Sequence, residues 1–309
     1  MDLYNEIGKR LITTVVGSYP PDSLSYEDAL TRAVKDQMNA GIDIISDGQV
    51  RANLIDLFAQ DIEGIELQGN SLKPIVVGDL AYKHPATIDD FLKAKKFSDN
   101  NYKIAGIITG PTTLAYSLEV SPEYRVRNKY NNRNYLTGEL ADILHKNAKE
   151  LEKAGADLIQ IDEPCFSLFQ KGIDKKVEFV DRVLEGIKVP TKLHVCGNIS
   201  KVYKFLLNLK NVNILDHEFS GNHNNLNTYT EEDLISNEKI IGFGCINTMS
   251  ETVEHIKDIE NFIQKGIDHF GKNIIVDPDC GMRLLPYEIA FGKLKNMVIA
   301  AKHVEEKLY

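Results

Sequence analysis

The segment KAGADLIQID at residues 153–162 ends a helical pattern with a glycine and continues as a short apolar run that stops at an aspartate. Glycine favours the end of a helix because it adopts the left-handed conformation without a steric penalty. A short apolar run bounded by polar residues is typical of a buried strand. The same order occurs in AGIDIISD at residues 40–47, and KGID at residues 265–268 repeats its opening. A recurring helix-then-strand unit predicts an α/β protein with parallel strands.

Eight apolar runs along the chain are each followed by polar residues or glycine. They lie near residues 12–16, 42–46, 104–109, 157–162, 191–196, 212–218, 239–245 and 273–277. Helical patterns fill the intervals, beginning with residues 26–40 behind a Ser25 cap. Eight alternating strand and helix units predict a (β/α)8 TIM barrel. A doubly wound open sheet is the alternative, which the lack of a Gly-x-Gly-x-x-Gly motif after the first strand disfavours.

Residues 50 to about 102 are expected to be an insertion after the second strand. They contain a helical pattern at 50–60, two strand-like runs that turn at Gly69-Asn70, and a second helical pattern at 86–96. With this helix-hairpin-helix insertion, residues 1–309 are predicted to form a single barrel domain.

An Asn-rich stretch at residues 124–134 predicts a loop. It is either a solvated linker or a lid or docking surface for an anionic partner. Its basic side chains are Arg125, Arg127, Lys129 and Arg133.

The composition limits the classes of partner. The chain has 36 Lys and Arg against 45 Asp and Glu, a net charge of -9, which argues against binding to nucleic acid or to an anionic membrane surface. No apolar run is long enough for a membrane helix, and residues 1–10 lack the apolar core of a signal peptide, so we expect a soluble cytoplasmic protein. Four cysteines in 309 residues are too sparse for a disulfide framework and favour metal binding or simple burial.

The residues that can hold a metal gather where the predicted strands end. His194 and Cys196 are two residues apart, so they point to the same face of a strand that Gly197 stops. A lone His-x-Cys pair on an apolar strand is more often ordinary packing. Two further strand ends add Glu218 and Cys280, however, and an imidazole, a carboxylate and two thiolates suit tetrahedral zinc. We therefore predict a zinc site at the carboxyl rim of the barrel.

Several segments together resemble the catalytic, carboxyl-terminal barrel of the cobalamin-independent methionine synthases. The resemblance covers essentially the whole chain and rests on TTVVGSYP (13–20), TGP (109–111), IDEP (161–164), HVC (194–196), the strand end at Glu218, and VDPDCG (276–281). It implies a zinc-dependent methyltransferase that makes methionine from homocysteine.

The resemblance also implies roles for single residues. In the family, the residues matching His194, Cys196, Glu218 and Cys280 bind the zinc that activates homocysteine. The backbone matching Val16, Gly17 and Ser18 and the carboxylate matching Asp162 hold the amino-acid end of homocysteine, in agreement with the affinity of peptide N–H groups for a carboxylate and of a buried aspartate for an ammonium. Where the family has Gly-Glu after the second strand, this chain has Gly48-Gln49, so Gln49 would meet the homocysteine ammonium as a neutral acceptor.

Departures from the family pattern concern the methyl donor. Long family members carry an additional amino-terminal barrel that helps to hold polyglutamyl folate, and this sequence begins directly at the catalytic barrel. The family also uses a Trp, a Glu and a His with folate, whereas this chain has no Trp and carries Leu168 and Asn247 at the other two positions. A methyl-folate amine needs protonation to leave, whereas a cobalt(I) corrinoid leaves without a proton. We therefore expect methylcobalamin or a methyl-corrinoid protein as the donor, the protein docking on the basic side chains at 125–133.

Other readings of the same residues stay open. A zinc methyltransferase of the same superfamily acting on another thiol, such as coenzyme M, is the main alternative, although Asp162 disfavours a thiol that has no ammonium. A metal-free relative resembling uroporphyrinogen decarboxylase leaves the four predicted ligands without a purpose. A structural zinc module is disfavoured because such sites usually have closely paired Cys ligands on short loops.

Overall fold

The computed structural model describes residues 6–68, 73–127 and 132–308. Eight parallel strands lie in the order β1-β11-β10-β9-β8-β7-β5-β2. Their bounds are β1 (Ile12–Thr13), β2 (Ile44–Ile45), β5 (Lys103–Thr109), β7 (Leu158–Asp162), β8 (Thr191–Val195), β9 (Ile214–Glu218), β10 (Ile240–Gly244) and β11 (Ile274–Asp277). A parallel bridge from Thr14 to Ile44 joins the first strand in this order to the last, so the sheet closes on itself. The predicted (β/α)8 barrel is confirmed, and each strand overlaps one of the eight predicted runs.

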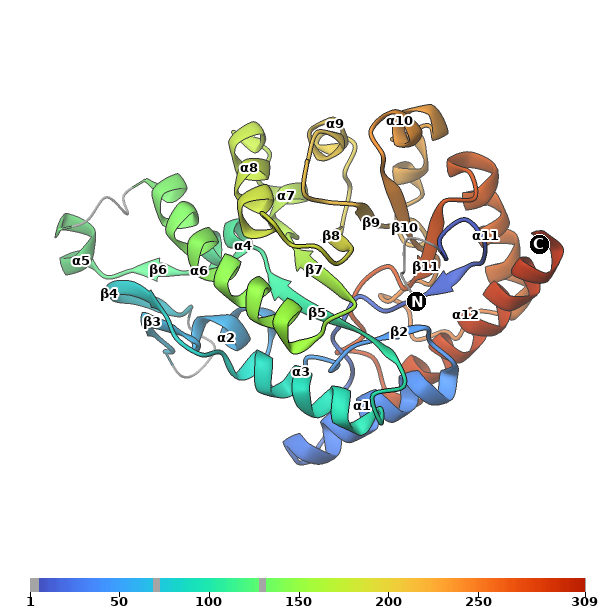
Figure 1. The fold of residues 1–309 in the computed structure, drawn as a ribbon, viewed down its shortest axis with the longest axis horizontal. Helices are drawn as coiled ribbons and strands as arrows, with labels where there is room; N and C mark the ends of the chain where they lie inside the picture. The colour runs from blue at the N-terminus through green and yellow to red at the C-terminus, as the bar shows by residue number, and fades with distance from the viewer. Residues whose placement is uncertain (1–5, 69–72, 128–131, 309) are drawn as a thin grey trace.

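Helices surround the strands on the outside of the barrel (Figure 1). Those outside the insertion are α1 (Tyr26–Ala40), α4 (Pro111–Ser117), α5 (Pro122–Arg127), α6 (Arg133–Ala154), α7 (Cys165–Leu168), α8 (Ile173–Val183), α9 (Tyr203–Leu207), α10 (Glu231–Ser236), α11 (Ile256–Phe270) and α12 (Tyr287–Leu308). The first helix has the predicted bounds because the Ser25 side chain accepts a hydrogen bond from the Asp28 N–H and Gly41 ends the helix at φ 86°.

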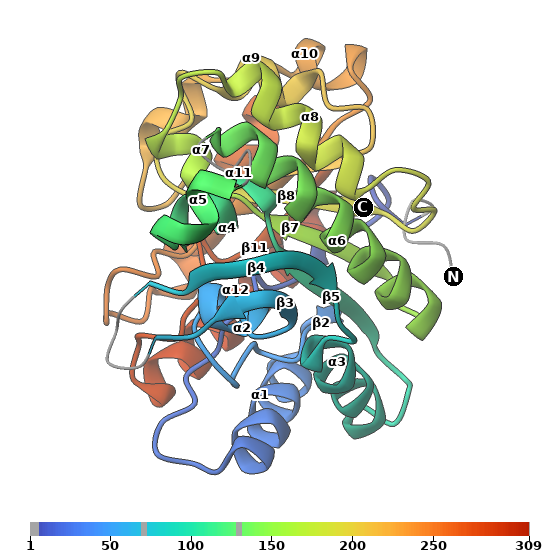
Figure 2. The ribbon, with the colours of Figure 1, turned by 90° about the vertical axis from the view of Figure 1, so that its left-hand side faces the viewer.

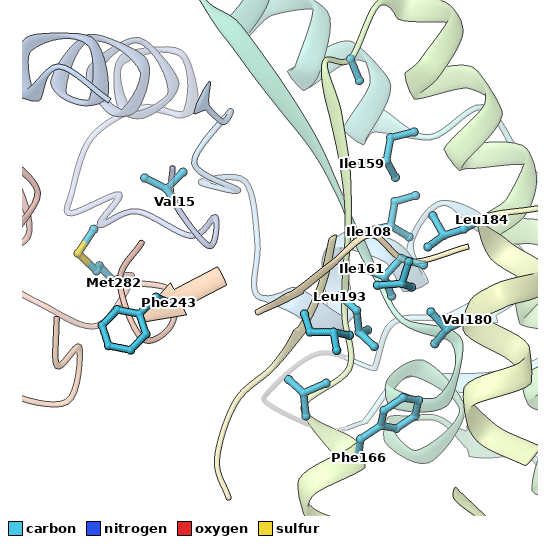
Figure 3. Packing of buried hydrophobic residues seen from close by; sticks show 14 of the residues in the cluster. Val15, Ile108, Ile159, Ile161, Phe166, Val180, Leu184, Leu193, Phe243 and Met282 are labelled. Carbon is cyan, nitrogen blue, oxygen red and sulfur yellow. The ribbon is translucent and has the colours of Figure 1, made fainter. Parts of the chain in front are cut away.

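The apolar core has two parts. Alternate residues of a strand point to opposite faces, so β7 sends Leu158 inward and Ile159 and Ile161 outward. Figure 3 shows side chains of the outer part, among them Ile161 of β7 and Val180 of α8, which belong to the same buried cluster. The inner part fills the barrel with seven buried apolar side chains: Ile12, Ile44, Ala105, Ile107, Leu158, Ile214 and Ile275. This inner part supports the polar residues farther along the strands.

The predicted insertion consists of α2 (Leu54–Ala59), β3 (Ile62–Glu66), β4 (Ile75–Tyr82) and α3 (Ala86–Phe97). β3 and β4 form the expected antiparallel hairpin, whose predicted turn at Gly69-Asn70 lies outside the described residues. Helix α3 packs against α1 and α6, so it also serves as the helix between the second and third barrel strands (Figure 2). A two-residue strand, β6 (Glu119–Val120), pairs with β4 and was not predicted, because two residues carry no periodic pattern.

The prediction of a loop at residues 124–134 is wrong at both ends, where the structure has helices. Helix α5 covers residues up to 127, starting after Ser121, whose hydroxyl accepts a hydrogen bond from the Tyr124 N–H. Helix α6 begins at Arg133, whose guanidinium donates to the carbonyls of Ala115 and Leu118 and is therefore engaged inside the protein. The prediction for Lys129 falls outside the described residues.

Among the described residues, no helix has both the length and the apolar character needed to cross a membrane.

Glu163, at the end of β7, holds the start of α4. Its carboxylate is fully buried and accepts hydrogen bonds from the backbone N–H groups of Thr112 and Thr113, each at 2.8 Å, and from the Thr113 hydroxyl at 2.7 Å. Gly110, the cap residue of α4, has no side chain to do this, and a Cβ there would lie 2.3 Å from the Glu163 Cδ atom. The carboxylate thus caps α4 from a neighbouring strand.

We expect Glu163→Ala to lower the free energy of unfolding by about 2–4 kcal/mol, because three buried donors lose their acceptor. Chemical denaturation monitored by circular dichroism measures this loss. Glu178→Ala is the control, since Glu178 is exposed on α8. Equal stability of the two variants would contradict the capping role.

Candidate metal centre

Three of the predicted metal ligands meet at the carboxyl ends of the strands. His194 is the fourth residue of β8, Cys196 follows the end of that strand, and Cys280 lies three residues after β11. One ligand atom from each residue lies within 4.8 Å of the ligand atoms of the other two. The imidazole is 2% exposed and both cysteines are half-buried. Residues more than 80 positions apart, as 280 is from 194, are therefore brought together as the strand-end argument expects.

The donor set fits a zinc ion. Neither ring nitrogen of His194 has an aligned hydrogen-bond partner among the described residues, although Nδ1 lies 3.3 Å from a carboxylate oxygen of Asp216. A buried ring nitrogen without an aligned hydrogen bond is costly unless it binds a ligand. An imidazole nitrogen beside two thiol sulfurs is a donor set typical of zinc.

The surroundings of Cys280 disfavour ionisation of its thiol. Contact with the Cys196 thiol, together with burial, raises the pKa of Cys280 well above its ordinary value. Burial disfavours the charged form of His194, but the Asp216 carboxylate outweighs it and raises the pKa of the imidazole well above its usual value. Metal binding here therefore has to displace protons, as is general for thiolate sites.

Glu218, the fourth predicted ligand, lies outside this group of three among the described residues. It ends β9, and because His217 pairs with Val195, it lies on the strand next to β8 at the level of Cys196. The side chain is half-buried, and its backbone carbonyl accepts a hydrogen bond from the Asn225 amide at 2.7 Å. The structure thus puts Glu218 at the correct rim without bringing its carboxylate into the group.

The predicted amino-acid site lies beside the candidate ligands. Asp162 pairs in register with His194 and is 5% exposed, and burial raises the pKa of this carboxyl to about 6. The Gln160 amide donates to Asp162 at 2.6 Å and to the Val16 carbonyl at 2.5 Å. Gln160 was not predicted as a site residue, although its position two before Asp162 on one strand places both on the same face.

A cavity of 340 Å³ joins these residues. Val16, Ser18, Gln49, Asp162, His194, Cys196 and Cys280 line it, so every predicted site residue except Gly17 and Glu218 contributes to its wall. Gly17 has φ 148°, and a Cβ there would lie 2.8 Å from the Gln49 side-chain oxygen, which explains why only glycine allows this close approach. The mouth of the cavity also includes Met249 and Leu284, which were not predicted.

Leu168 and Asn247 stand where the family has the Glu and the His that it uses with folate. Leu168 ends α7, is 71% exposed and is not among the residues that line the cavity. The Asn247 side-chain oxygen accepts a hydrogen bond from the Met249 N–H at 2.8 Å. Asn247 therefore stabilises the turn that holds Met249 at the cavity mouth.

A closed (β/α)8 barrel with thiols, an imidazole and a carboxylate around a cavity at its carboxyl rim has the features of a barrel enzyme. A family model described as "Cobalamin-independent synthase, Catalytic domain" matches residues 22–303. The methionine synthase of Methanocaldococcus jannaschii is 39% identical, over 96% of this chain and 100% of that protein. The methionine synthase of Methanothermobacter thermautotrophicus is 37% identical, over 94% and 99%.

The chain belongs to the cobalamin-independent methionine synthase family and is, accordingly, a methyltransferase. The solved B12-independent methionine synthase of Shewanella sp. W3-18-1, in complex with selenomethionine, has the same fold, with a TM-score of 0.83 at 24% identity over 97% of this chain and 99% of that one. A methyltransferase from Methanosarcina mazei has a TM-score of 0.69 at 13% identity over 95% and 94%.

Proposed function

We propose that this protein makes methionine by zinc-dependent methyl transfer to homocysteine. The observation that carries the proposal is the meeting of His194, Cys196 and Cys280 on the wall of a cavity that also contains Asp162. Glu218 completes the proposed ligand set from the neighbouring strand. Zinc at this site would supply the positive charge that keeps a substrate thiol deprotonated at neutral pH, where a free thiol with a pKa of about 8.5 is mostly protonated.

The chain's own residues bind and orient the amino-acid end of homocysteine in this proposal. The buried carboxylate of Asp162 has Gln160 as its hydrogen-bond partner, and a substrate ammonium adds the counter-charge that burial favours. The loop Val16–Ser18 offers backbone N–H groups to the substrate carboxylate. Gln49 lies against Gly17 and accepts from the ammonium without adding a second negative charge.

We infer that the methyl donor is methylcobalamin or a protein-bound methyl-corrinoid. The substrate sulfur forms a bond to the methyl carbon, the carbon–cobalt bond breaks, and its electron pair stays on cobalt, so no proton is needed. A methyl-folate donor requires an acid beside the leaving nitrogen. Asn247 has no acidic proton, and its side-chain oxygen is already held by the Met249 N–H. Leu168 is likewise unable to donate a proton.

Replacing one thiol tests the metal assignment. We expect Cys280→Ala to lower bound zinc from about one ion per chain to a small fraction and to abolish methyl transfer, because one of the two thiolate ligands is removed and the remaining ligands hold the ion more weakly. Metal analysis of the purified protein measures this. Cys165→Ala, which removes a cysteine outside the group of three, is the matched control and should keep its zinc. Full zinc and full activity in Cys280→Ala would show that the ligand assignment is wrong.

Neutralising Asp162 separates substrate binding from metal binding. We expect Asp162→Asn to keep its zinc but to lose about 1.5–3 kcal/mol of homocysteine recognition, which corresponds to a roughly 10- to 150-fold loss in kcat/KM, because a charged hydrogen bond is removed. Thiols that lack an amino group should react equally with both proteins. If wild type already uses thiols with and without an amino group equally well, the assignment of Asp162 fails and the alternative acceptor, a thiol such as coenzyme M, is favoured.

The donor is tested with zinc-loaded protein assayed side by side on two methyl sources. We expect methyl transfer to homocysteine from methylcobalamin, and little or none from mono- or polyglutamyl methyl-tetrahydrofolate, because no acid stands at the position of Asn247. Methionine formation measured by chromatography gives the answer, with Cys280→Ala as the blank. Robust turnover with methyl-folate and none with methylcobalamin would overturn the donor proposal and leave the zinc proposal standing.

A further inference from the structure

A fully buried ion cluster lies inside the barrel next to the candidate metal centre. The Lys192 ammonium lies 2.9 Å from a carboxylate oxygen of Asp216 and 2.9 Å from one of Asp277. All three side chains are 0% exposed. A buried ion cluster is usually no more stable than apolar side chains of the same volume, because each charge loses its hydration. Its presence therefore calls for an explanation other than stability.

Each member of the cluster shortly precedes a proposed zinc ligand in the chain. Lys192 is two residues before His194 on β8, Asp216 is two before Glu218 on β9, and Asp277 is three before Cys280 at the end of β11. Residues two apart on a strand share a face, so Lys192 and His194 both point into the barrel. The cluster thus touches each of the three strands that supply the ligands.

The backbone does not connect all three of these strands directly. β8 and β9 are neighbours, but β10 separates β9 from β11, so no ladder of backbone hydrogen bonds joins β8 to β11. Lys192 spans this gap across the barrel interior, and it also donates to the Val15 carbonyl at 3.3 Å, just before the loop Val16–Ser18.

The intervening strand leaves room for the cluster. Gly242 of β10 pairs with Asp216, and a Cβ at Gly242 would lie 2.7 Å from the Asp216 Cβ atom. Any larger residue at this position would displace the Asp216 carboxylate, which also lies 3.3 Å from His194 Nδ1. The absence of a side chain at Gly242 thus allows the Asp216 carboxylate to stay beside the imidazole of His194.

We infer that Lys192, Asp216 and Asp277 form a positioning triad that fixes the spacing of the metal-binding strands and directs the His194 ring. The inference rests on the proposed zinc site. Within the triad, Lys192 sets the distance between β8 and β11. The Asp216 carboxylate faces Nδ1 of the His194 ring, so that Nε2 remains available to bind the metal. Carboxylates behind metal-binding histidines commonly change metal affinity 10- to 100-fold when they are replaced.

The test compares two sets of substitutions. Lys192→Met alone leaves two buried carboxyl groups without the lysine between them and should lower both the melting temperature and the metal affinity. The triple variant Lys192→Met, Asp216→Asn, Asp277→Asn has no charge left in the cluster, so its melting temperature should return toward that of wild type. Its affinity for zinc, measured by competition with a chelator, should still be 10- to 100-fold weaker. The visible spectrum of bound cobalt(II) should also change, because the ligand geometry is no longer fixed.

A matched control uses another buried lysine. Lys293 on α12 is 0% exposed and lies 2.8 Å from Glu254, outside the group of candidate ligands. Lys293→Met should lower the melting temperature without changing zinc affinity or the cobalt(II) spectrum. This variant shows what loss of a buried ion pair does when no ligand-bearing strand is involved.

The outcomes separate this inference from the proposed function. Wild-type zinc affinity and a wild-type cobalt(II) spectrum in the folded triple variant would overturn the positioning triad while leaving the zinc site intact. Wild-type protein that binds neither metal would overturn the proposed zinc site itself. If the triple variant does not fold, Lys192→Met with Asp277→Asn removes the lysine and one of its two carboxyl partners and keeps the Asp216 carboxylate beside His194. Unchanged zinc affinity in that folded variant would show that Lys192 does not set the strand spacing and would overturn the triad as inferred.

Discussion

The parallel register of β7, β8 and β9 is the constraint on which the site depends. Asp162 pairs with His194, and His194 pairs with Asp216, so one polar residue from each strand stands at the same level. Because side chains alternate between faces, a shift of β8 by one residue would turn His194 from the barrel interior into the layer of apolar side chains under the helices. The register of the sheet therefore determines the position of the imidazole. Cys196 and Cys280 follow the ends of their strands and lie above it.

The barrel interior changes from apolar to charged along the strand direction. Below, residues such as Ile214 and Ile275 exclude water and give the strands a packed support. Above, burial favours the neutral form of Asp216, yet Lys192 and His194 hold the pKa of this carboxyl well below its usual range. Ionised groups are thus kept where water cannot screen them, which strengthens their interactions with one another. The large apolar layer between strands and helices offsets the cost of burying them.

The alternation of strand and helix patterns was enough to predict the closed barrel, and reading only the strand ends was enough to select His194, Cys196 and Cys280. The contact of Lys192 with Asp277 could not be predicted this way, because sequence spacing does not say which strands face each other across a barrel. Strand β6 was missed for a different reason: its two residues pair with β4 only because the insertion folds back on α4 and α6. For Glu218, the spacing predicts the strand and the level, whereas the direction of the side chain depends on packing.

The side chains at the cavity mouth are exposed and apolar, whereas those at its floor are buried and polar, and this difference bears on where each substrate would bind. Met249 and Leu284 are 88% and 94% exposed, whereas Asp162 and His194 on the floor are at most 5% exposed. Under the proposed function, a small polar thiol would occupy the floor with its ammonium at Asp162, and a large donor with an apolar surface would cover the mouth. Exposed apolar side chains that lie together at the mouth of a cavity are typical of a surface that a ligand or partner covers. A donor seated on them would shut water out above the thiol, so that the reacting sulfur and the methyl group meet in a site whose charges are set by the protein alone.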